Sequence, residues 1–167
     1  MDRMPLIAII FQSIPESIII FYLGLAGINI KPKFHKVLPA AILSSLVSWL
    51  VRGFPLLFSI HTLIGLFVFF CLFIIILRVP PLKAIVASLF AFSSLLGTEA
   101  ILFPIITGFV NMANIQEAWE SPVLRIILAM PELILLAAIT YFLIRNRISF
   151  ESFAYGDSRQ KKEHFDK

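Results

Sequence analysis

Five long runs of apolar residues, separated by short polar or basic segments, account for most of the chain. A run of about 20 apolar residues is the length that an α-helix needs to cross the hydrocarbon core of a bilayer. We therefore predict an all-α integral membrane bundle of five transmembrane helices. The predicted spans cover about 5–27, 37–53, 60–77, 84–110 and 123–144.

This pattern predicts one membrane domain over 1–147, followed by a polar cytoplasmic tail over 148–167. The tail is mixed in charge and poor in apolar residues toward its end, which is typical of a partly disordered segment. The segment 53–60 is apolar but contains Gly53 and Pro55, and it is too short to cross a bilayer. It fits a re-entrant or interfacial turn.

Composition supports the membrane assignment and removes several classes of function. Hydrophobic residues make up 59% of the chain and charged residues 14%, against about 25% charged in an ordinary soluble domain. We therefore expect the protein to be embedded in the lipid bilayer of the plasma membrane. The net charge of +4 comes from loops and the tail and not from one helix face, so we expect no nucleic-acid partner. The single cysteine, Cys71, excludes an intrachain disulfide.

Basic residues gather in the segments that share one side of the membrane when all five spans cross. These segments hold Lys31, Lys33, Lys36, Arg78, Lys83, Arg145, Arg147, Arg159, Lys161, Lys162 and Lys167. The opposite side receives only Arg3, Arg52 and Arg125, together with Glu117 and Glu120. Cytoplasmic segments of membrane proteins carry the excess of Lys and Arg. We therefore predict that the N-terminus lies outside and that the C-terminus is cytoplasmic.

Small residues recur four apart in the second span, at Ala40, Ser44 and Ser48. This spacing lets helix backbones approach closely, and it predicts a helix–helix packing seam. Ser44, Ser48 and Arg52 also follow one stripe at i, i+4 and i+8. A polar track leading to a positive charge near the outer face is the alternative interpretation.

Three carboxylates interrupt the apolar runs, at Glu16, Glu99 and Glu132. Pro15 and Pro131 directly precede two of them, and a proline removes a backbone donor and frees a carbonyl one turn earlier. Each carboxylate lies about 9 to 12 residues from the outer end of its span, which places all three at a similar depth. Carboxylates at such depth are usually buried against protein and often functional. We predict a ligand- or proton-binding site here, the alternative being structural groups satisfied by serine or backbone.

Four further polar residues are candidates for the same site: Gln12, Arg52, His61 and Arg125. Gln12 lies one turn before Glu16, and Arg125 lies seven residues before Glu132 on the same helix face. Arg52 and His61 lie near the outer ends of the second and third spans. Converging carboxylates in a low-dielectric site cannot all ionise without a counter-charge, so we expect at least one to be protonated at neutral pH.

The sequence gives no support for an enzyme. No His, Cys, Asp and Glu cluster has metal-ligand spacing within a predicted helix. Nucleophile-elbow, P-loop and zincin patterns are missing as well. We therefore expect no catalytic activity, no metal and no cofactor.

Several short segments in the first half of the chain together resemble a known family. The run 11–16, Phe-Gln-Ser-Ile-Pro-Glu, is followed by 22–25, 27–32, Arg52 and 55–62. Together these residues resemble the N-terminal membrane-sensor region of certain Gram-positive sensor histidine kinases with GHKL-type ATPase domains. Neither a phosphoacceptor-histidine segment nor a Gly-rich ATP site occurs in the 167 residues. The resemblance therefore implies a stand-alone sensor-like or regulatory membrane module and not a kinase.

Three functions are compatible with the sequence. The first is a regulatory or sensor-like module that acts through a membrane or cytoplasmic protein partner, such as a kinase, a transporter or a scaffold. The second is a small transport component, either a substrate-binding subunit or a proton- or cation-coupled carrier, because broken helices near midplane charges are typical of transporters. The third is a scaffold, comparable in size and hydropathy to rod-shape-determining proteins of the MreD type. Each is compatible with a homo-oligomer.

Overall fold

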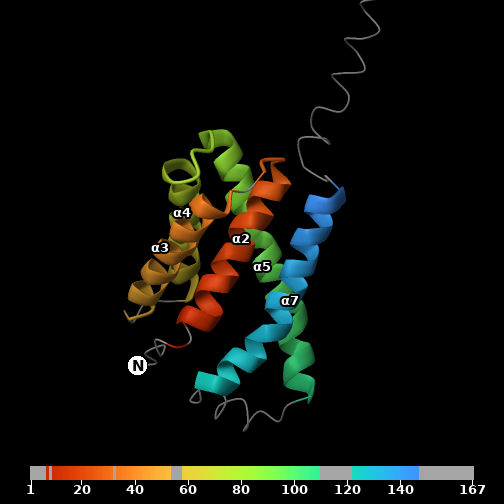
Figure 1. The fold of residues 1–167 in the computed structure, drawn as a ribbon. Helices are drawn as coiled ribbons and strands as arrows, with labels where there is room; N and C mark the ends of the chain where they lie inside the picture. The colour runs from red at the N-terminus through yellow and green to blue at the C-terminus, as the bar shows by residue number, and fades with distance from the viewer. Residues whose placement is uncertain (1–6, 8, 32, 54–57, 110–121, 147–167) are drawn as a thin grey trace, which may run out of the picture.

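The computed structural model describes residues 7, 9–31, 33–53, 58–109 and 122–146, and all regular structure among them is helical (Figure 1). The elements are η1 (Ile9–Ser13), α2 (Ile14–Gly27), α3 (Phe34–Arg52), α4 (Phe58–Ile75), α5 (Pro81–Phe109) and α7 (Pro122–Asn146). The all-α prediction is confirmed. The predicted tail and half of the 53–60 segment, residues 54–57, lie outside the described residues.

Four helical segments are long and apolar enough to cross a bilayer: Ile9–Gly27, Phe34–Val51, Pro81–Ile106 and Ile126–Asn146. The apolar part of α4, Ile60–Ile75, is shorter than these four. The chain is therefore a helical, multi-pass membrane protein with four candidate spans. It associates with the bilayer through the apolar side chains that these helices expose.

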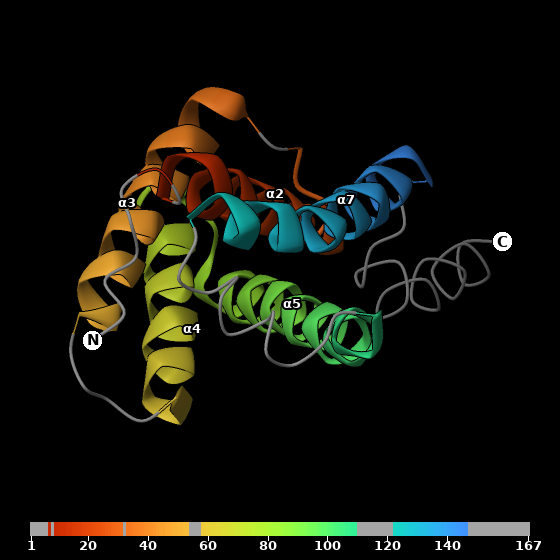
Figure 2. The same ribbon diagram turned by 90° about the horizontal axis from the view of Figure 1, so that it is seen from below.

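Successive helices run in opposite directions (Figure 1). The helices α2, α4 and α7 run from the lower to the upper end of the view, and α3 and α5 run back. Seen from below, α2 lies beside α3 and α7, while α4 and α5 form the other side of the bundle (Figure 2). The most extensive helix contacts join α2 to α5, to α7 and to α3. The helix that begins with Ile14-Pro15-Glu16 is thus the centre of the packing.

Proline and asparagine set the limits of α2. The π-helical turn η1 directly precedes α2, and Pro15 lies in the first turn of α2. A proline cannot donate to the carbonyl one turn earlier and its ring crowds that carbonyl, so a wider turn before Pro15 has a local cause. At the other end, the amides of Asn29 and Ile30 donate to the carbonyls of Ala26 and Leu25. Asn29 has a φ of 55°, as the αL position of this C-terminal motif requires.

The core of the bundle contains an aromatic cluster between α2 and α4. The ring of Phe21 lies 4.7 Å from that of Phe69 and 5.2 Å from that of Phe73, both on α4. Phe21 and Phe73 are completely buried. Gly24 makes room for this contact, because a Cβ atom there would lie 2.6 Å from Cζ of Phe73 and 3.0 Å from the carbonyl oxygen of Ala87.

Candidate functional site

The three predicted carboxylates lie on the three helices that pack against one another. Glu16 is in the first turn of α2, Glu99 is in the second half of α5, and Glu132 follows Pro131 inside α7. Each pair among α2, α5 and α7 is in contact. Because α5 runs opposite to the other two helices, its second half lies beside the first halves of α2 and α7 (Figure 1).

Glu132 has a buried carboxyl oxygen atom. Its side chain is partly buried, and its Oε1 atom is buried with no hydrogen-bond partner within the part of the chain that is described. The carboxyl groups of Glu16 and Glu99 lie close enough to interact electrostatically with it. Like charges repel strongly where water is scarce.

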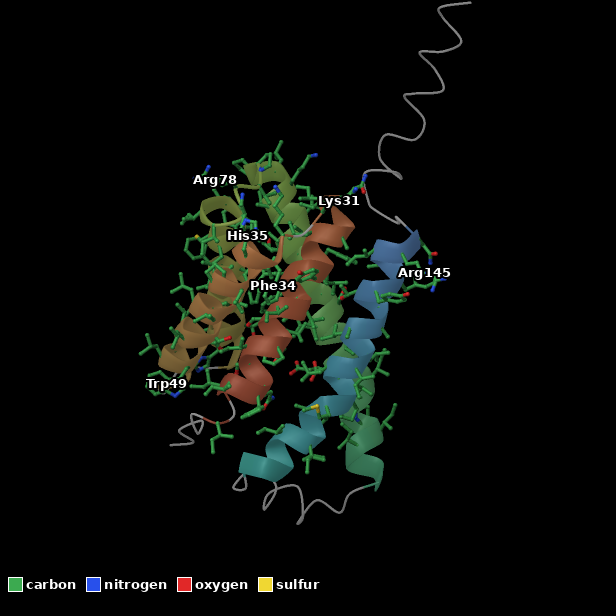
Figure 3. All side chains as sticks on the ribbon, in the orientation of Figure 1. Lys31, Phe34, His35, Trp49, Arg78 and Arg145 are labelled. Carbon is green, nitrogen blue, oxygen red and sulfur yellow. The ribbon has the colours of Figure 1, made fainter. Side chains whose placement is uncertain are left out.

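The other two carboxylates differ in exposure. Glu16 is partly buried and Glu99 is exposed, and both take part in further interactions. In the view of Figure 3, side-chain oxygen atoms gather between the lower part of α2 and the middle of α7. No three His, Cys, Asp or Glu side chains in the described ranges are grouped so that they could hold a metal ion.

Gln12 lies in the π-helical turn η1, which contacts both α3 and α7. Its side chain is partly buried, and its Oε1 atom has no hydrogen-bond partner among the described residues. The sequence places Gln12 one regular turn before Glu16. The wider turn between them changes the relative direction of the two side chains, because a π turn rotates less per residue than an α turn.

The remaining predicted site residues lie on other parts of the bundle. His61 is in the first turn of α4, a helix without a carboxylate, and its buried Nδ1 atom has no partner among the described groups. Arg52 is the last residue of α3, and Arg125 lies in the first turn of α7. The side chains of Arg52 and Arg125 lie outside the described part of the structure, so their pairing with the carboxylates stays a prediction.

The predicted packing residues of α3 face different environments. Ala40 is completely buried, Ser44 is buried, and Ser48 is partly buried. The neighbouring Ser45 is buried as well, and its Oγ atom lies 3.2 Å from Oγ of Ser17 on α2. Ser45 donates its one proton to the carbonyl of Ala41 at 2.8 Å, so Ser17 is the donor between the two serines.

The seam between α2 and α5 was not predicted from the sequence. Ala84, Ala87 and Ala91 of α5 are buried at i, i+3 and i+7, on one helix face. On α2, Gly27 approaches α5 so closely that a Cβ atom would lie 2.7 Å from Cδ1 of Phe90. The spacing of these alanines is a small-residue signal that the sequence does contain.

The basic turns lie together at one end of the bundle. Lys31, His35, Arg78 and Arg145 all lie at the upper end of Figure 3, and Trp49 lies at the lower end. Arg145 lies over the ring of Tyr141, 6.0 Å from its centroid, and donates to its hydroxyl at 3.2 Å. The end at which α2, α4 and α7 finish is therefore the positively charged end.

Comparison of the chain with protein-family models, with curated proteins and with solved structures returned no match. The function is therefore inferred from the described residues themselves.

Proposed function

We propose that all five helices cross the plasma membrane, with the basic end in the cytoplasm and the start of α2 toward the outside. The alternating helix directions support this topology, as does the clustering of basic residues at one end. With 18 residues, α4 has a length of about 27 Å, close to the hydrocarbon thickness of about 30 Å.

We further propose that the protein is a regulatory, sensor-like membrane module. Its input is a proton or a positively charged ligand, which is received by the carboxyl groups of Glu16, Glu99 and Glu132. The observation that carries the proposal is the buried Oε1 atom of Glu132, which has no hydrogen-bond partner among the described residues and lies near the carboxyl groups of Glu16 and Glu99 on packed neighbouring helices. Uptake of positive charge relieves the repulsion between the helices, and a change in their packing is passed to a protein partner.

The test compares Glu132→Gln and Glu16→Gln with Ser93→Ala, an exposed position on α5. The tagged full chain is cross-linked in native membranes over a range of pH, and its captured partners are quantified. We expect a partner whose yield depends on pH for the wild type and for Ser93→Ala. Each glutamine variant should accumulate normally but lose the pH dependence, because glutamine keeps the shape of glutamate and removes its charge.

Two outcomes would contradict the regulatory proposal. Unchanged capture by both glutamine variants would make the carboxyl groups packing elements, as in a membrane scaffold. A cation or vitamin that raises the unfolding temperature without any partner would instead support a transport component. The π-helical turn beside Glu16 favours transport as the second candidate, because helices that are irregular near charged groups are typical of transporters.

A further inference from the structure

The positively charged end of the bundle combines exposed cations with exposed apolar side chains. Lys31 and Lys33, between α2 and α3, are exposed, and so is Arg78 between α4 and α5. Directly beside these turns, Phe34 is 57% exposed and Leu82 is 80% exposed. We call these five residues the basic surface. The described acidic residues all lie within α2, α5 and α7, away from it.

Two helices begin in the basic surface. The helix α3 starts at Phe34 and α5 starts at Pro81, and neither has an acidic residue in its first turn. Lys33 is the N-cap of α3 and makes no side-chain cap hydrogen bond. Backbone N–H groups at a helix start attract anions, whereas a cation there is on the unfavourable side of the helix dipole. An anion bound between Lys33 and the first N–H groups of α3 would offset the repulsion between the lysine charge and the positive end of the helix dipole.

We propose that the basic surface binds the phosphate groups of anionic lipids in the adjoining leaflet. The lysines and Arg78 contact the phosphodiester, while Phe34 and Leu82 enter the acyl-chain region beneath it. A soluble phosphopeptide or a nucleic acid matches the charge but offers no apolar layer for these two side chains. A lipid supplies both the anionic phosphate and an apolar layer. At the boundary between the two, Lys can contact the phosphate while a neighbouring Phe or Leu lies among the acyl chains.

The test uses the full chain in detergent micelles, titrated with short-chain phosphatidylglycerol, with phosphatidylcholine of equal chain length, or with inorganic phosphate. Thermal unfolding and native mass spectrometry report binding. The variant Lys31→Gln/Lys33→Gln removes two charges, and Lys31→Arg/Lys33→Arg keeps them. Each lysine near an anionic surface contributes about a fivefold factor, so the glutamine variant should bind phosphatidylglycerol roughly 25-fold more weakly.

We expect phosphatidylglycerol to raise the unfolding temperature of the wild type and of the arginine variant more than phosphatidylcholine does. Equal responses to the two lipids would overturn the proposal, as would undiminished phosphatidylglycerol binding by the glutamine variant. Stabilisation by inorganic phosphate alone would show that the surface binds phosphate and not lipid. If the glutamine variant does not fold, the comparison of the two lipids on the wild type and the arginine variant decides. None of these results depends on the carboxyl groups.

Discussion

Replacing Gly24 by alanine should loosen the contact of α2 with α4 and α5. The added Cβ atom would lie 2.6 Å from Cζ of Phe73 and 3.0 Å from the carbonyl oxygen of Ala87. Phe73 has little room to retreat, because its ring is completely buried and packs against Phe21. The carbonyl of Ala87 belongs to a helix backbone and cannot move without moving α5.

The size of the effect follows from two opposing terms. Overpacking by a methyl group costs about 1–3 kcal/mol. Replacing glycine by alanine inside a helix gains about 0.5–1 kcal/mol. The packing term is larger because one of the two close atoms is backbone, so we expect Gly24→Ala to lower the free energy of unfolding by about 1–2 kcal/mol. Reversible unfolding in mixed micelles, followed by circular dichroism, measures this change.

Gly97→Ala is the matched control, because a Cβ atom at Gly97 of α5 would have no atom of the described residues within 4 Å. It should leave the stability unchanged or raise it by up to about 1 kcal/mol. If Gly24→Ala and Gly97→Ala have the same stability, α2 does not approach Phe73 and Ala87 as closely as described, and the packing interpretation is wrong.

Two further predictions concern the polar and irregular parts of α2. Ser45→Ala should destabilise the protein more than Ser17→Ala does. Ser45→Ala leaves the Ser17 hydroxyl without its acceptor, whereas in Ser17→Ala the Ser45 hydroxyl keeps its bond to the carbonyl of Ala41. A double-mutant cycle should give a coupling free energy of about 0.6 kcal/mol, and a coupling of zero would exclude the interhelical bond. Pro15→Ala should convert the π-helical turn before α2 into regular α-helix, because alanine restores the backbone donor that proline lacks. Hydrogen exchange should then slow at the amides of Ile14 and Glu16. Unchanged exchange at these amides would mean that the π-helical turn has another cause.

The helical membrane architecture could be predicted from sequence because it depends on run length alone. A stretch such as Ile126–Asn146 is too long and too apolar for other structures. The irregular turn before α2 could be predicted because its cause is local. Pro15 lacks a backbone donor in any environment, and the π-helical turn lies directly before it. Asn29 at the end of α2 is a similarly local signal.

The rotation of each helix about its axis could not be predicted. Both faces of a membrane helix are apolar, so the periodicity that identifies the buried face of a soluble helix is weak. The buried seam of α5 therefore had to be observed at Ala84, Ala87 and Ala91. The surroundings of Glu132 depend on three such rotations at once, and the sequence indicates only their common depth. The pairing of the carboxylates with arginine remains a prediction because those arginine side chains are not described.

The central position of α2 also has a consequence for biosynthesis. Among the described helices α2 is translated first, yet it packs extensively against α7, which is translated last. Until α7 is inserted, Glu16 and the neighbouring face of α2 have no α7 to cover them in the bilayer. A nascent chain that stalls after α5 would therefore leave one face of α2 without its partner helix, and incompletely packed chains of this kind are prone to misassembly.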